Sequence, residues 1–110
     1  MPVIKRLAGP TAMSATMTTN IYNPAATADA VVRAIHVVNK TAGTRTFSLW
    51  LGATGGNAAG TELYSAESVL AYSSWTRFRA LKMTSTDFLV GGADAATSLT
   101  IVVEGELIAV

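Results

Sequence analysis

The sequence predicts an all-β fold: an antiparallel β-sandwich or jelly roll with an extended N-terminal arm. One observation is the alternation of apolar and polar residues along residues 45–51 and 99–103, because successive side chains of a strand point to opposite faces of a sheet. A second is the spacing of turn signals, which recur roughly every ten residues and separate about six to eight short strands. This spacing is typical of antiparallel sandwiches and not of alternating βα units. With 110 residues, the chain has the size of one domain.

Residues 1–18 are predicted to form the arm, and residues 19–110 the sandwich. The arm has neither a helical nor a strand period, small polar residues dominate it, and Pro2 and Pro10 discourage a helix. Two roles remain open for it: it folds back over its own domain, or it clasps another subunit. Its candidate apolar anchors are Val3, Ile4, Leu7, Met13 and Met17.

Residues 30–51 are predicted to form a hairpin around which the rest of the chain is organised. The first strand is a β-branched run without a helical period, made of Val31, Val32, Ile35, Val37 and Val38. The reversal at residues 40–43 is predicted to place Gly43 at a positive φ, as a short hairpin loop usually requires. In the second strand, the residues predicted to share one face are Arg45, Phe47, Leu49 and Leu51.

Shorter strands are predicted on both sides of this hairpin. Residues 18–22 form the first, and residues 62–65 form another after a glycine-rich loop. Residues 65–74 fit a helical turn, a strand or an irregular crossover, of which the crossover is favoured.

Three more strands are predicted toward the C-terminus. Residues 75–83 alternate again, and residues 87–90 form a short strand that Gly91 and Gly92 end. Residues 98–110 form the last long strand, in which Gly105 is expected to mark a bulge. Its residues predicted to share one face are Leu99, Ile101, Val103 and Leu107.

Composition restricts the kinds of site that the chain can form. Cysteine is absent, which excludes disulfides and thiolate sites, and the single histidine, His36, excludes a site built on two imidazoles. The net charge of +1 provides no field that would attract nucleic acid or an anionic membrane. Residues 7–28 carry no charge but are too polar for a transmembrane helix, and no apolar signal segment follows Met1. Neither nucleic acid nor a membrane is therefore expected as a partner.

Charge is unusually scarce in this chain. Charged residues make up 14% of it, compared with about 25% in an average protein. A lone soluble monomer normally carries more surface charge. Two interpretations remain open: a β protein with a Thr- and Ser-rich surface, or a protein whose surface is largely covered by neighbouring subunits.

No combination of residues predicts a catalytic centre, a metal site or a cofactor. His36 lies in an apolar run and is expected to be a packed or hydrogen-bonded structural group, because a triad would need a nearby serine and an orienting carboxylate. Glu104 and Glu106 project from one face of a strand, whereas a glycosidase pair faces across a cleft. These two carboxylates are expected to be solvated or ion-paired. The chain is therefore predicted not to be an enzyme.

An interface with other protein chains is the favoured kind of site. The candidate residues outside the arm are Trp50, Tyr72, Trp75, Arg77, Arg79, Glu104 and Glu106. Trp75, Arg77 and Arg79 lead this set, since Trp and Arg are enriched at interface hot spots. If the strands of two subunits meet, the two arginines are expected to pair with Glu104 and Glu106. The same cluster as a nucleic-acid surface is less favoured, because no wider basic field surrounds it.

The order of elements resembles a family of small β-sandwich virion proteins of tailed bacteriophages. The stretches that carry the resemblance are Ile21-Tyr22-Asn23-Pro24-Ala25, VVRAIHVVNKTAGTRTFSLWLG at residues 31–52, GTELYSAESV at residues 60–69, the Trp-bearing strand, and SLTIVVEGELIAV at residues 98–110. The match spans about residues 20–109 and leaves the arm outside it. One departure is the first loop, in which Ala-Thr-Ala-Asp follows the Asn-Pro-Ala entry.

The resemblance implies a structural protein of the virion, assembled in the host cytoplasm and without catalysis. Within that class, a capsid decoration (cement) protein is expected, a homo-oligomer that binds the major capsid protein or other virion structural proteins. A tail, neck or fibre-adaptor component of the same particle is the nearer alternative. A carbohydrate-binding attachment module is the more distant one, and it would use Trp50, Tyr64 and Tyr72.

Overall fold

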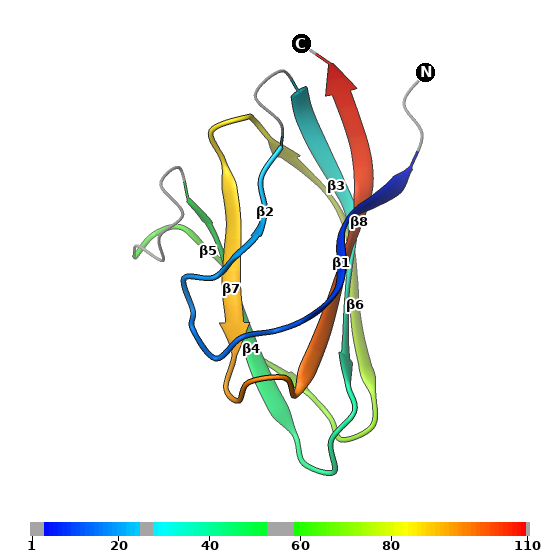
Figure 1. Cartoon of the computed structure of the whole chain (residues 1–110), viewed down its shortest axis with the longest axis vertical. Coiled ribbons are helices and arrows are strands. Elements are labelled where there is room, and N and C mark those ends of the chain that lie inside the picture. Colours follow the sequence, from blue (N-terminus) through cyan, green and yellow to red (C-terminus); the bar gives the residue numbers. More distant parts are fainter. Residues whose placement is uncertain (1–3, 25–27, 53–58, 110) are drawn as a thin grey trace.

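The structure, a computed structural model of the chain, describes residues 4–24, 28–52 and 59–109. These residues form two four-stranded antiparallel sheets that pack face to face (Figure 1). The predicted antiparallel β-sandwich is confirmed. Within the described ranges, no helix has the length and apolar character needed to cross a membrane.

The strands alternate between the two sheets along most of the chain. Sheet A has the order β1 (Lys5–Ala12), β8 (Leu99–Ala109), β3 (Ala28–Asn39) and β6 (Ser74–Met83). Sheet B has the order β2 (Asn20–Tyr22), β7 (Phe88–Ala93), β4 (Arg45–Gly52) and β5 (Glu62–Val69). Consecutive strands change sheets at every connection except that from β4 to β5. This order favours the jelly-roll form of the sandwich, which stays a prediction.

The predicted central hairpin is wrong, because β3 and β4 lie in opposite sheets. β3 pairs with β6 and β8, whereas β4 pairs with β5 and β7. The β-branched run correctly located β3, and the alternation correctly located β4 and its buried face, on which Phe47 and Leu49 are buried. It could not choose their partners, since two strands that cover one core from opposite sides have the same pattern as a hairpin.

The turn between β3 and β4 depends on Asn39 and not on a left-handed glycine. Gly43 is not among the glycines with a positive φ. The Asn39 side chain is buried, and its Oδ1 accepts hydrogen bonds from the Thr41 backbone N–H (2.8 Å) and the Thr41 hydroxyl (2.7 Å). Its Nδ2 donates to the carbonyl oxygens of Gly43 and Val69, each at 2.9 Å. One buried amide therefore ties this turn to the end of β5.

The N-terminal segment is extended, but it is not an arm separate from the sandwich. Residues 5–12 form β1, which pairs with β8 at the edge of sheet A. Met13 is 3% exposed and lies in the core, while Leu7 packs against the core from the edge. The strand has no regular alternation because its register with β8 shifts twice, and an edge position tolerates Pro10, which lacks an N–H. The predicted boundary at residue 18 is therefore wrong.

A bulge explains why the first part of β3 has no clean period. The register of β3 shifts between Val32 and Ala34 against both of its neighbours. Ala30 and Val32 are buried before the shift, and Ile35 and Val37 after it, so that Arg33 is the extra residue against β8 and is exposed. Against β6, the step from Leu81 to Phe78 places the extra residue in β6 itself. Gly105 lies at the same level of β8, and a Cβ there would overlap the Val31 carbonyl oxygen. The bulge therefore lies in β3 opposite Gly105, and not in β8 itself as predicted.

Two further boundaries differ from the prediction. β5 continues to Val69, because a register shift next to Ala66, which has φ 50°, interrupts the alternation without ending the strand. The predicted crossover therefore begins only after residue 69. Gly91 and Gly92 lie inside β7 and do not end it. A Cβ at Gly91 would overlap the Ser48 carbonyl oxygen of β4, so close strand packing accounts for this glycine.

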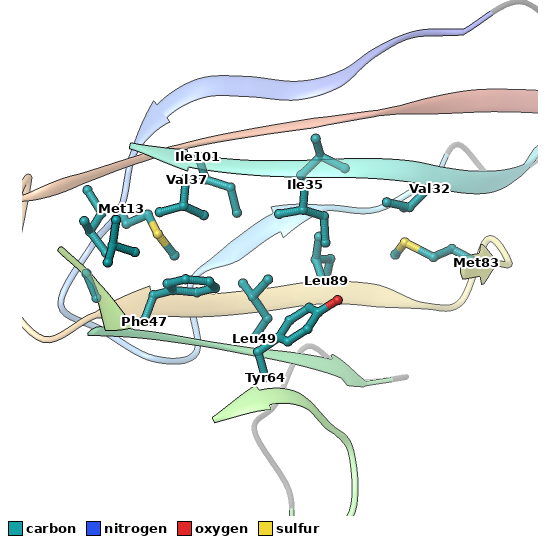
Figure 2. Close-up of a cluster of buried hydrophobic side chains, with 14 of the residues drawn as sticks. Met13, Val32, Ile35, Val37, Phe47, Leu49, Tyr64, Met83, Leu89 and Ile101 are labelled. Atoms are coloured by element: carbon teal, nitrogen blue, oxygen red, sulfur yellow. The ribbon is translucent and has the colours of Figure 1, made fainter. Parts of the chain in front are cut away.

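The core fills the space between the sheets (Figure 2). Sheet A contributes Val32, Ile35, Val37, Met83 and Ile101 from one side, and sheet B contributes Phe47, Leu49, Tyr64 and Leu89 from the other. The predicted inner face of β8 is confirmed, since Leu99, Ile101 and Val103 are buried and Leu107 packs against them. Burial of these side chains supplies the main favourable free energy of folding.

Candidate interaction surface along strand β6

The candidate site lies on the side of the sandwich where β5, an edge strand of sheet B, and β6, an edge strand of sheet A, face each other. Between these edges lies an aromatic cluster of Phe47, Tyr64 and Trp75. The Trp75 ring contacts Phe47 at 4.8 Å and Tyr64 at 5.0 Å between centroids, in both cases edge to face. Trp75 lies opposite Val37, a core residue, so its side chain belongs to the inner face of β6. The cluster fixes β6 to the core at one end.

Arg77 and Arg79 lie over this aromatic cluster. The Arg77 guanidinium carbon is 5.4 Å from the Trp75 ring centroid and 5.6 Å from that of Tyr64. Arg79 lies 5.7 Å from the Tyr64 centroid and donates a hydrogen bond from its Nη1 to the Tyr64 hydroxyl at 3.0 Å. Cation–π contact of this kind holds a guanidinium in place but leaves most of its N–H donors free.

Within the described residues, neither guanidinium has a carboxylate partner. All seven Asp and Glu side chains of the sequence lie in the described ranges, and none of them forms an ion pair with Arg77 or Arg79. Glu104 and Glu106 project from the outer face of sheet A, as predicted for a shared face. There Glu104 Oε1 contacts His36 Nε2 at 2.8 Å, and Glu106 Oε2 accepts from Arg33 at 2.9 Å. Their predicted pairing with the arginines of a second subunit stays a prediction.

On the outer face of β6, Phe78 is 76% exposed. Its only ring contact in the described part of the chain is with His36, edge to face at 6.2 Å. His36 Nδ1 also lies 3.2 Å from the Thr76 hydroxyl, so the imidazole connects β6, β3 and β8. The expected hydrogen-bonded histidine is confirmed.

The turn that leads into β6 extends this exposed surface. Leu70 and Tyr72 are 65% and 74% exposed, and Val38 on the adjacent end of β3 is also exposed. The Tyr72 backbone N–H donates to the Thr41 carbonyl oxygen at 3.1 Å, which places the turn beside the β3–β4 loop. We call Leu70, Tyr72, Arg77, Phe78 and Arg79 the β6 surface.

The remaining predicted interface residues are dispersed. Ile4 is exposed, Met17 and Trp50 are half-buried, Met13 belongs to the core, and Val3 lies outside the described residues. Sequence reasoning missed Leu70, because it lies in a turn where no periodic signal marks it.

The described residues contain no pocket and no group of side chains that could hold a metal ion. One pKa shift accompanies burial: desolvation raises the pKa of Tyr22 on β2 above its usual value. No model of a known protein family matches the chain, and no curated protein matches it.

Proposed function

We propose that the chain is a structural protein of a bacteriophage particle, and specifically a capsid decoration protein that binds the head shell. The observation that carries this proposal is the β6 surface, which exposes three large apolar side chains and two stacked arginines along one edge of a rigid sandwich. Exposed aromatic and Arg residues of this kind are the ones enriched at protein interfaces. The resemblance to small β-sandwich virion proteins supports the same class.

The fold suits such a role because it presents an interface without changing shape. The aromatic cluster and Asn39 fix the two ends of the β5–β6 turn, so little ordering entropy is lost when a partner binds. Many copies on one shell add avidity, and each contact can therefore be modest. We also propose that the decorating species is a homo-oligomer, which would account for the scarcity of charge.

The N-terminal segment contributes less to this proposal than the sequence suggested. Leu7 and Met13 pack within their own chain, which removes them as anchors for a neighbour. Ile4, which is 61% exposed, and the half-buried Met17 are the anchors that remain within the described residues. We therefore place the main contact with the shell on the β6 surface.

Co-sedimentation with purified head shells tests the proposal, combined with light scattering of the free protein. We expect wild type to saturate the shells, and the Leu70→Ser, Tyr72→Ser variant to bind at least tenfold more weakly, because it removes exposed apolar contacts without touching the core. Lys5→Gln, on the opposite edge of sheet A, is the matched control and should bind like wild type. A monomer that binds no shells would contradict the proposal.

A tail, neck or fibre-adaptor role in the same particle is the alternative, and the same experiment with purified tails distinguishes it. The carbohydrate-binding alternative is disfavoured by the geometry. Of its three aromatic residues, Tyr64 is 7% exposed and covered by Arg77 and Arg79, and Trp50 is half-buried. Of the three, Tyr72 alone presents an exposed ring, so the set does not form the aromatic groove that this alternative needs.

A further inference from the structure

The four edges of the sandwich are not equally able to accept an additional strand. β2 has only three residues. β1 is interrupted by Pro10 and two register shifts, and β5 by two register shifts and the left-handed Ala66. β6 is the longest edge, with ten residues and a single register shift. Proline, bulges, shortness and charged side chains are the usual protections of an edge strand, and β6, which is long and has no proline, is protected chiefly by its charges.

The charge of β6 is one-sided. It carries Arg77, Arg79 and Lys82 and no acidic residue. Lys82 already contacts Asp29 at 3.7 Å, whereas the two arginines have no acidic partner in the described part of the chain. A second β6 pairing with this edge would bring like charges together, which disfavours self-association here.

The two arginines are also pre-organised. Stacking on Tyr64 and Trp75 restricts their guanidinium groups before any partner arrives. A carboxylate can then be bound in the bidentate geometry with less loss of side-chain freedom than at a free surface arginine. The exposed cations Lys5, Arg6 and Lys40 have no such aromatic support among the described contacts.

The outer face of β6, opposite to the face that carries the arginines, favours a different kind of side chain in a partner strand. Phe78 projects from the outer face, where it is 76% exposed, while Arg77 lies opposite the core residue Ile35 on the inner face. A strand added beside β6 would therefore alternate, with acidic side chains next to the arginines and apolar side chains next to Phe78.

We propose that β6 binds an extended segment of a partner protein as an added strand, and that this segment alternates acidic and apolar residues. Backbone hydrogen bonds to the open edge supply affinity, and the arginines and Phe78 supply specificity. The inference rests on the proposed function only in taking the β6 surface as the contact with the partner.

The test uses the full ¹⁵N-labelled chain and two synthetic peptides, Ac-EVEVEVE-amide and Ac-KVKVKVK-amide. We expect the acidic peptide to shift the amide signals of β6, and the basic peptide to shift none of them. An acidic peptide N-methylated at alternate residues should bind at least tenfold more weakly, because it cannot complete the backbone ladder. This comparison uses wild-type protein, so it does not depend on a variant that folds.

Two variants test the role of the arginines. Arg77→Gln, Arg79→Gln should weaken the acidic peptide at least tenfold and reduce the salt dependence of binding. Lys5→Gln, Arg6→Gln removes the same charge from the β1 edge and should leave binding unchanged.

Four results would each overturn the proposal. They are amide shifts centred on another strand, equal binding of both peptides, tighter binding of an oligothymidine at the same arginines, and a dimer formed through β6. If shells still bind while the acidic peptide does not, the inference fails and the proposed function stands; the reverse result rejects the decoration role alone.

Discussion

β6 and β8 flank the same strand, β3, yet their charged side chains have different kinds of partner. β8 is central, its inner-face residues Leu99, Ile101 and Val103 are buried, and both of its glutamates are paired with β3 side chains. β6 is an edge, most of its residues are exposed, and its two arginines contact aromatic rings but none of the carboxylates that the structure describes. The charges of β8 are satisfied by folding, whereas those of β6 remain available after it. This difference separates what holds the sandwich together from what it offers to a partner.

The largest expected effect is the difference in stability between two variants, one that removes an apolar side chain from β8 and one that removes an apolar side chain from β6. Ile101→Ala on β8 should lower the free energy of unfolding by about 2–5 kcal/mol, because it leaves a cavity in the core. Phe78→Ala on β6 should change it by less than about 0.5 kcal/mol, because the ring is exposed. Urea unfolding of both variants measures the difference. Equal losses would remove the distinction between the strands.

Trp75 is the residue of β6 whose substitution should destabilise the fold, as substitution of a core residue of β8 does. Trp75→Leu loses two edge-to-face contacts and should lower the free energy of unfolding by about 1–3 kcal/mol. Arg77→Gln, two residues further on, is the control and should cost less than about 0.5 kcal/mol. If Trp75→Leu proves as harmless as its control, the aromatic cluster does not anchor the edge.

A smaller effect is expected where the paired charges of β8 are removed. Glu106→Gln breaks the contact with Arg33 and should lower the free energy of unfolding by about 0.2–1 kcal/mol, the range for partly exposed ion pairs. The loss should shrink at high salt, because the pair is screened. Chemical denaturation at two ionic strengths measures it, and a loss that is independent of salt would speak against an electrostatic origin.

The smallest effect concerns Tyr22 on β2, an edge strand whose aromatic ring, unlike that of Phe78, packs against the core. Burial raises its pKa in the folded state above the usual value of about 10. The stabilisation is therefore complete below about pH 10, and it is lost as the pH rises through the folded-state pKa. Tyr22→Phe should lack this part of the alkaline loss. Unfolding measured from about pH 8 to about pH 11 compares the two chains, and identical profiles would contradict the assignment.

The sequence predicted the layers of the fold better than its connections. Alternation located the buried faces of β4 and β8, because Phe47, Leu49, Leu99, Ile101 and Val103 follow a period of two. It did not reveal which strands pair, since pairing partners leave no periodic trace in a single chain. The boundary errors in β1 and next to Ala66 in β5 fall where a bulge or a proline interrupts the period, whereas the error in β7 came from reading two closely packed glycines as a strand end.

The candidate site was predicted in part for a similar reason. Composition singled out Trp75, Arg77 and Arg79, which the structure brings together with Tyr64. Only the three-dimensional arrangement shows that Glu104 and Glu106 have partners within the chain. Ion pairs between strands distant in sequence depend on register, and one bulge changes that register for every residue beyond it.

Amide hydrogen exchange of the full chain, free and bound to head shells, tests the central claim most directly. We expect the amides of β8 to be protected in both states, and the amides of residues 74–83 in β6 that point away from β3 to gain protection only on the shell. Protection gained on another edge, with these β6 amides still exchanging freely in the bound state, would contradict the account.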